Sequence, residues 1–128
     1  MGEVRAICTI ANGLDSTIVP LKVDALVDSG AVMPMLGRDI VDKLGVTSNR
    51  KAVVTLADDS KCEMDVAGPI AITFGDRIAH MDCLVGPVGA EPLLGQIVME
   101  MLDLVIDCQH RTLTVRPESP AYPSYKLK

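Results

Sequence analysis

The sequence predicts an all-β domain, a small closed barrel of short strands with one or two short helices. Two observations favour this class. Apolar residues make up 48% of the chain and aromatic residues only 2%, so the core must consist of Val, Ile, Leu, Met and Ala side chains, which suit short strands. Short apolar segments are also separated repeatedly by Gly, Asp and Asn, which are typical of turns. A chain of 128 residues is long enough for one such domain and too short for two.

Two strands are expected at the start of the chain, over residues 3–10 and 16–27, separated by the turn residues Asn12-Gly13. An extended segment over residues 32–36 follows, interrupted by Pro34. Gly37 then begins a short helix that ends at Gly45. The apolar residues on one face of this helix are Ile40, Val41 and Leu44.

Two hairpins and a second helix are expected further along the chain. Residues 53–56 and 62–66 flank the polar tip Asp58-Asp59-Ser60, and residues 70–74 and 78–85 flank Gly75-Asp76. A helix is predicted over residues 96–102, followed by a last strand pair over 104–107 and 112–115. Residues 1–116 are therefore predicted to form the domain. Residues 117–128, which hold both tyrosines, are predicted to be a loose C-terminal extension.

Shifting the sequence by 58 residues places its second half on its first. Because Pro, Gly and the apolar spacing agree together, the shift predicts an internal pseudo-two-fold repeat. One position differs in its chemistry, since Asp28 corresponds to Gly86. The identical positions are Asp24, Leu26, Val27, Pro34, Leu36, Gly37 and Leu44, which fall on Asp82, Leu84, Val85, Pro92, Leu94, Gly95 and Leu102.

Composition excludes several classes of partner. The net charge of −5, without a Lys/Arg cluster, argues against nucleic acid and against an anionic membrane. No apolar run approaches the roughly 20 residues of a membrane span, and residues 1–5 do not open a signal peptide. Four cysteines without a CxxC pair predict reduced thiols and a cytoplasmic protein. The spacings His80/Cys83 and Cys108/His110 match no known metal site, so neither a metal nor another cofactor is predicted.

The segment with the clearest chemical character is an apolar strand that ends in Asp28, Ser29 and Gly30. A carboxylate at the end of a buried strand is costly unless hydrogen bonds or partners use its charge. Gly30 lets the backbone turn sharply there. The simpler interpretation is an ordinary D-S-G turn, which is a common composition.

Residues 26–31, with the sequence Leu-Val-Asp-Ser-Gly-Ala, resemble the active-site motif of retropepsin-like aspartic proteases, apolar-apolar-Asp-Thr/Ser-Gly-Ala/Ser. Leu93-Leu94-Gly95 before an apolar helix resembles the second signature of that family. Leu84-Val85-Gly86-Pro87 is similar to the retroviral form, and the hairpin over residues 53–66 lies where the family has its flap. The resemblance covers residues 3–115, and it implies the retropepsin (acid protease) type of barrel.

This resemblance implies peptide hydrolysis by two carboxylates that share one proton, so that one activates a water while the other protonates the carbonyl oxygen. The chain offers one such carboxylate, Asp28, and a symmetric homodimer would supply it twice. The resemblance implies that Ser29 hydrogen-bonds to the partner's backbone. The expected catalytic residues are therefore Asp28, Ser29 and Gly30. The residues expected to contact a peptide or protein substrate are Ala31, Val32, Leu56, Ala57, Asp58, Asp59, Ser60, Val85 and Val88.

Two functions remain open at this point. The first is a homodimeric aspartic endopeptidase. The second is a catalytically weak or inactive retropepsin-like module for dimerisation or peptide binding. The motif at Asp28 favours the first, because an inactive module has no reason to keep a carboxylate at a symmetry axis. The acidic flap tip, where many relatives have Gly, supports the second.

Overall fold

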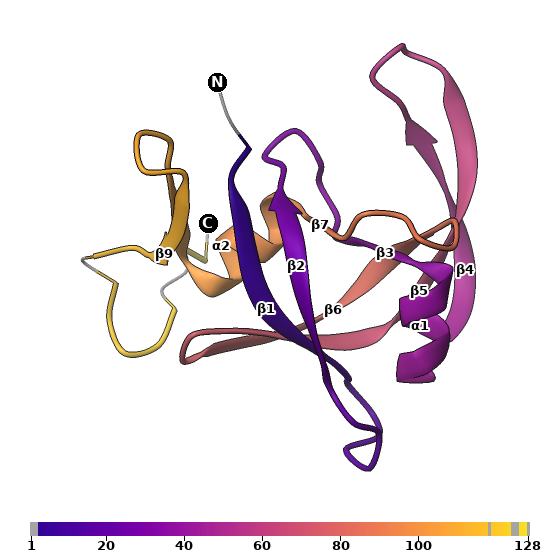
Figure 1. Cartoon of the computed structure of the whole chain (residues 1–128), viewed down its shortest axis with the longest axis horizontal. Helices are drawn as coiled ribbons and strands as arrows, with labels where there is room; N and C mark the ends of the chain where they lie inside the picture. The colour runs from indigo at the N-terminus through magenta and orange to yellow at the C-terminus, as the bar shows by residue number, and fades with distance from the viewer. Residues whose placement is uncertain (1–2, 118, 124–125, 128) are drawn as a thin grey trace.

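The computed structural model describes residues 3–117, 119–123 and 126–127 of the chain. Within them, half of the residues are in strands and the helices are short, so the predicted all-β class is confirmed. Figure 1 shows the elements. In chain order they are β1 (Arg5–Asn12), β2 (Leu21–Val27), β3 (Met35–Gly37), α1 (Arg38–Leu44), β4 (Thr47–Thr55), β5 (Lys61–Phe74), β6 (Arg77–Gly86), β7 (Leu93–Leu94), α2 (Gln96–Leu102), β8 (Leu104–Asp107) and β9 (Thr112–Val115).

The central feature is a closed barrel. In the described part of the chain, six strands follow one another in the order β1-β2-β7-β3-β6-β5, and β5 pairs back onto β1, where Ile10 lies opposite Ile72. Closure leaves these strands without free edges. β4 pairs only with β5, so these two strands extend beyond the barrel as a long hairpin, at the upper right of Figure 1. β8 and β9 form a separate two-stranded sheet on the opposite side.

Alternate residues of the strands fill the barrel, as the period of two in a strand requires. Along β1 and β2, the inward positions are buried and their neighbours are wholly or partly exposed. The largest fully buried side chains are aliphatic, in agreement with the low aromatic content. They include Ile10, Leu36, Val41, Leu44, Val66, Ile70, Ile72, Leu94, Val98 and Leu102.

The predicted two-fold repeat is confirmed by strand pairing. β2 pairs with β7 in parallel, with Val27 opposite Leu94, and β3 pairs with β6 in parallel, with Leu36 opposite Val85. The shift of 58 residues converts one of these pairs into the other. The antiparallel pair Met35 and Leu93 is converted into itself, so the internal axis passes between β3 and β7. The same shift superimposes the bounds of α1 on those of α2.

The helices begin and end as their sequences predict. Gly37 precedes α1, and Gly45 ends it with a φ of 67°, a left-handed conformation that glycine adopts without steric cost. The Gly45 N–H donates to the Asp42 carbonyl at 3.1 Å. α2 covers residues 96–102, as predicted, and ends at Asp103, also left-handed with a φ of 56°.

The predicted strand over residues 16–27 is wrong in its first part, because β2 begins only at Leu21. Residues 13–20 form a loop in which side chains satisfy the backbone. Asn12 Oδ1 accepts the N–H groups of Leu14 and Asp15, and Asp15 Oδ1 accepts the Thr17 N–H at 3.0 Å. The extended segment over residues 32–36 is likewise shorter, since only β3 pairs.

The two predicted hairpins share one continuous strand, β5. The predicted hairpins left a break at residues 67–69, but the chain only shifts its register against β6 between Ala67 and Ile70. Gly68 permits the two strands to approach closely there, because a Cβ at this position would lie 2.2 Å from Asp82 Oδ1. A bulge therefore replaces the expected break.

Part of the C-terminal extension is attached to the barrel. The Arg77 guanidinium is only 4% exposed, and its Nη2 donates to the Ser119 hydroxyl at 2.8 Å and to the Pro120 carbonyl. Ser119 in turn donates to Asp103, which also accepts two hydrogen bonds from Arg116 at 2.9 Å. These bonds lower the pKa of Asp103 to about 2. Residues 119–120 are thus bound rather than loose, while the boundary at residue 116 stays a prediction.

Candidate active site

The end of β2 holds Asp28 at a defined place. The Asp28 N–H donates to the Leu94 carbonyl of β7 at 2.9 Å, so the last step of β2 is anchored inside the barrel. The chain then turns, with the Ala31 N–H donating to the Asp28 carbonyl at 3.1 Å. Asp28 Oδ1 accepts the Gly30 N–H at 2.9 Å, which orients the half-buried carboxylate within its own turn. The second carboxylate oxygen has no hydrogen-bond partner among the described side-chain contacts of Asp28, so it is available to a ligand.

The N-terminus of α2 holds the loop after Asp28 through backbone hydrogen bonds. The N–H groups of Gln96 and Ile97 donate to the carbonyls of Ala31 and Val32 at 2.8 and 3.0 Å. The approach is so close that a Cβ on Gly95 would lie 2.7 to 2.8 Å from the carbonyl oxygens of Ala31, Val32 and Met33. Glycine is therefore required at position 95 for steric reasons, and this explains why a Leu-Leu-Gly motif accompanies the Asp-Ser-Gly turn.

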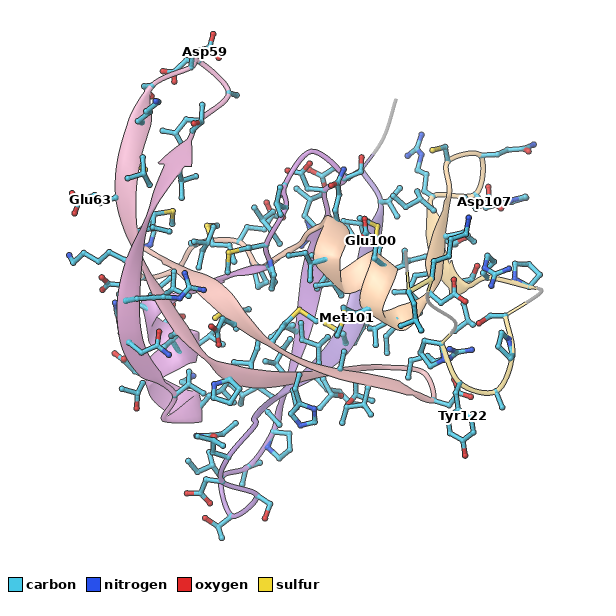
Figure 2. The ribbon with its side chains drawn as sticks, turned by 180° about the vertical axis from the view of Figure 1, so that it is seen from behind. Asp59, Glu63, Glu100, Met101, Asp107 and Tyr122 are labelled. Atoms are coloured by element: carbon cyan, nitrogen blue, oxygen red, sulfur yellow. The ribbon has the colours of Figure 1, made fainter. Side chains whose placement is uncertain are left out.

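A cleft of about 1540 Å³ opens beside Asp28. Its walls are the loop after β2, the end of β6 with the loop that follows, and the β4–β5 hairpin. Figure 2 shows the hairpin standing beyond the barrel, with Asp59 at its tip and Glu63 along one strand. The predicted site residues that line the cleft are Asp28, Gly30, Ala31, Val32, Leu56, Ala57, Asp59, Val85 and Val88.

Three predicted site residues lie elsewhere. Ser29 is exposed and borders a separate pocket of about 390 Å³ between the start of β1 and the turn between β8 and β9. Asp58 and Ser60 are at the hairpin tip but do not line the cleft. In the described residues, no group of three or more His, Cys, Asp or Glu side chains is placed to hold a metal ion.

Sequence reasoning missed much of the cleft wall. Its further apolar members are Met33, Met35, Ala52, Val53, Val54, Met64, Leu84, Pro87 and Leu93, and its charged members include Arg38, Lys51, Glu63 and Asp65. The hairpin residues that line the cleft are consecutive, over 51–57 and 62–65, so no alternation of polar and apolar residues would have singled them out.

An ion pair joins the hairpin to the body of the molecule at the base of the cleft. Arg38, the first residue of α1, donates to Asp65 of β5 at 2.7 Å. Lys51 Nζ of β4 lies 3.6 Å from the other oxygen of Asp65. The charges at this end of the cleft are therefore largely paired with each other.

The acidic hairpin tip has a clear division of roles. Asp58 Oδ1 accepts the Ser60 N–H at 3.0 Å and the Ser60 hydroxyl at 2.5 Å, which lowers the pKa of Asp58. Asp58 thus stabilises the turn. Asp59 has a φ of 66°, a conformation that favours glycine, and it lines the cleft.

Asp59→Gly should tighten the hairpin tip, because glycine adopts this left-handed conformation without the cost borne by a residue with a Cβ, about 1 kcal/mol. The Leu56 N–H donates to the Ser60 carbonyl across this turn, so amide hydrogen exchange at Leu56 measures the effect. We expect exchange to slow about fivefold. Asp58→Gly is the matched control, and it should accelerate exchange because it removes both bonds to Ser60. Faster exchange in Asp59→Gly would contradict the assignment of strain.

The closed barrel, its internal two-fold and the strand–turn–helix arrangement around Asp28 define a retropepsin-like fold. Two similar solved structures bear this out. EIAV protease in complex with the inhibitor HBY-793 is 21% identical with a TM-score of 0.55, over 77% of this chain and 86% of that chain. The retroviral protease-like domain of Ddi1 from Leishmania major is 18% identical with a TM-score of 0.60, over 91% and 90% of the two chains.

No protein-family model and no curated protein matches the sequence. Within the described residues, neither helix has the length and apolar character needed to cross a membrane. All four cysteines are free thiols: Cys8 and Cys83 are buried, Cys62 is half-buried and Cys108 is exposed.

Proposed function

We propose that the protein is a homodimeric aspartic endopeptidase that hydrolyses peptide bonds in extended polypeptide. The observation that carries this proposal is the half-buried carboxylate of Asp28, held at the edge of a large cleft in a retropepsin-like fold. A carboxylate in this position costs stability unless its charge is used. The four free thiols support a cytoplasmic location.

The internal repeat is the reason for requiring a dimer. Gly86 stands at the position that corresponds to Asp28, so one chain contributes one carboxylate. Hydrolysis by an activated water needs a base and an acid at the same place. Two copies related by a two-fold axis would bring two Asp28 side chains together. Ser29, which is exposed beside Asp28, is then free to hydrogen-bond with the partner's backbone.

In this dimer, the two Asp28 carboxylates share one proton and hold a water between them. The ionised carboxylate takes a proton from the water, whose oxygen attacks the carbonyl carbon of the substrate. The protonated carboxyl donates its proton to the carbonyl oxygen. The C–N bond breaks when the tetrahedral intermediate collapses: the ionised carboxylate takes a proton from one of its hydroxyls, and the protonated carboxyl gives its proton to the leaving nitrogen. The pair is left with its single shared proton.

The cleft wall supports a preference for apolar side chains. Val32, Val53 and Val88 line the cleft with 59%, 68% and 73% of their surface exposed, which is apolar area that a ligand would cover. An extended peptide can bind there as an added strand, with side chains in alternate pockets. We expect cleavage in flexible segments next to medium-sized apolar residues. Asp59 in the cleft should repel acidic peptides, an effect that salt weakens.

The second candidate is a module of the same fold that dimerises or binds peptide with little or no turnover. The acidic residues at the hairpin tip favour it, because Asp59 brings a charge to the place where the hairpin would cover a substrate. The two candidates differ in one measurable property, which is turnover.

Cleavage and subunit association should therefore change together. We expect an unstructured polypeptide rich in Val, Leu and Met to be cut, and a statine-type inhibitor to stop the reaction. The rate per subunit should fall as the protein is diluted below the dissociation constant measured by analytical ultracentrifugation, because the monomer holds half of the site. A competent monomer would contradict the dimer. A dimer that binds the inhibitor without cutting would support the second candidate.

A further inference from the structure

The loop after β6 forms a compact turn in the wall of the cleft. The Ala90 N–H donates to the Pro87 carbonyl at 3.0 Å, and Gly89 has a φ of 79°, as the third residue of a type II turn requires. Pro87 and Val88 of this turn line the cleft, and Val88 is among the most exposed large apolar side chains of the protein.

One side chain from another element holds this turn. Asp39, the second residue of α1, accepts the Gly89 N–H at 3.0 Å through Oδ1, across 50 positions of sequence. This hydrogen bond is the largest of the effects that lower the pKa of Asp39, so its carboxylate is ionised at neutral pH. A bond from an N–H to an ionised acceptor is about twice as strong as a neutral one.

Gly37 gives Asp39 the room for this contact. A Cβ on Gly37 would lie 2.5 Å from Asp39 Oδ1 and 3.0 Å from the Pro87 carbonyl oxygen. The start of α1 and the Pro87–Ala90 turn therefore pack directly against each other. Two contacts therefore hold the turn, namely its packing against Gly37 and its hydrogen bond to Asp39.

The internal repeat shows that the two halves of the chain hold their cleft loops by different means. The shift of 58 residues relates Ala31 to Gly89 and Ile97 to Asp39. In the half that contains Asp28, the loop accepts hydrogen bonds from the backbone of α2. In the other half, the loop donates one to a side chain of α1. The second arrangement depends on one residue, and a substitution can remove it.

We propose that Asp39 is a positioning residue that fixes the Pro87–Ala90 turn, so that Pro87 and Val88 form the wall that selects apolar substrate side chains. This role rests on the proposed peptidase function and deepens it. Asp39 does not line the cleft, so it acts through the turn and not by touching substrate. Because the Asp28 turn is held separately by α2, loss of Asp39 should weaken substrate binding and selectivity more than the chemical step.

The test compares Asp39→Ala, which removes the acceptor, with Asp39→Asn, which keeps Oδ1, and with Asp42→Ala. Asp42 is the matched control, because it lies on the same helix, is 68% exposed and does not line the cleft. We expect Asp39→Ala to raise KM about tenfold, the loss typical of a hydrogen bond to a charged group, with kcat within about twofold. The ratio of kcat/KM for substrates with Val and with Ala next to the scissile bond should be smaller in this variant than in the wild type. Asp39→Asn should recover most of both properties, and Asp42→Ala should resemble the wild type.

The Gly89 amide supplies a readout that needs no activity. The Gly89 amide proton, followed by NMR, should lose its protection from hydrogen exchange in Asp39→Ala and keep most of that protection in Asp39→Asn. Loss of protection with unchanged KM and selectivity would overturn the proposal, as would a fall in kcat as large as the rise in KM. If Asp39→Ala does not fold, Asp39→Asn and Asp39→Glu are compared in the same way, and equal selectivity in both and in the wild type would overturn it.

Failure of the proposed function is distinguishable from failure of this inference. If the wild type does not cleave, the peptidase proposal is wrong, and the dissociation constant of a fluorescent Val-rich peptide replaces KM. A rise of about tenfold in that constant for Asp39→Ala alone would support the positioning role. An unchanged constant, or a wild type that binds no peptide, would overturn it.

Discussion

Asp28→Asn should abolish cleavage while the protein stays folded. The amide cannot take a proton from water, and a general acid or base contributes about 10²–10⁴-fold to such a reaction. Because the substitution alters both sides of the proposed dimer, we expect a loss of at least about 10³-fold in kcat/KM. Asn has the same shape as Asp, and its Oδ1 can still accept the Gly30 N–H. Removing a charge that the proposed dimer would bury should leave the dimer at least as stable as the wild type.

The matched control is Asp24→Asn, on the strand that leads to Asp28 and outside the cleft. Asp24 forms a surface ion pair with Arg5, and such pairs contribute about 0–1 kcal/mol to stability, so the control should keep its activity. Asp28→Ala should also be inactive. Substantial residual cleavage by either Asp28 variant, in a sample whose dimer is confirmed by ultracentrifugation, would mean that the chemistry lies elsewhere.

Gly95→Ala should have the second large effect, on both stability and activity. The new methyl group would meet three backbone carbonyl oxygens at 2.7 to 2.8 Å, and backbone atoms have no alternative rotamer to adopt. Overpacking costs about 1–3 kcal/mol when side chains can move, so we expect about 3 kcal/mol or more here. The loop that must shift is the one after Asp28, so cleavage should fall even in the fraction of protein that remains folded.

Gly75→Ala provides the comparison for this experiment. Gly75 has a φ of 59° and no atom within 4 Å of an added Cβ, so its cost comes only from conformation, about 1 kcal/mol. It lies in the turn between β5 and β6, away from the cleft. The denaturant midpoint should therefore be highest for the wild type, lower for Gly75→Ala and lowest for Gly95→Ala, and activity should be lost only in Gly95→Ala. Equal midpoints for the two variants would contradict the steric argument.

The sequence alone was sufficient for the features that depend on neighbouring residues. The helices over residues 38–44 and 96–102 follow from an apolar face and a preceding glycine, and Gly45 also marks the end of the first helix. The change from strand to turn at Asp28 and the repeat of 58 residues also follow directly from the sequence. The helices and the turn depend on a few neighbouring residues, and the repeat is found by comparing the sequence with itself, so no tertiary contact is needed to detect them.

The boundaries that failed were those set by competing local contacts or by distant partners. The side chains of Asn12 and Asp15 accept hydrogen bonds from backbone N–H groups of the loop that precedes β2. The strand therefore begins later in the chain than its apolar residues suggest. β5 continues through Gly68-Pro69 because β6 pairs with it on both sides of the interruption. Neither the side-chain hydrogen bonds nor the pairing with β6 shows in the spacing of apolar residues, so a pattern of apolar residues does not reveal them.

Only the tertiary structure decided how the site is built. The sequence singled out Asp28 and Gly95 as parts of motifs, but the contact between Gly95 and the loop after Asp28 exists only when β7 lies beside β2. Asp39 looked like an ordinary first-turn residue of a helix until the fold placed Gly89 within hydrogen-bond distance. The physical reason is that local preference determines which elements form. The few contacts that close a loop or orient a carboxylate join residues far apart in the chain, and closure of the barrel brings them together.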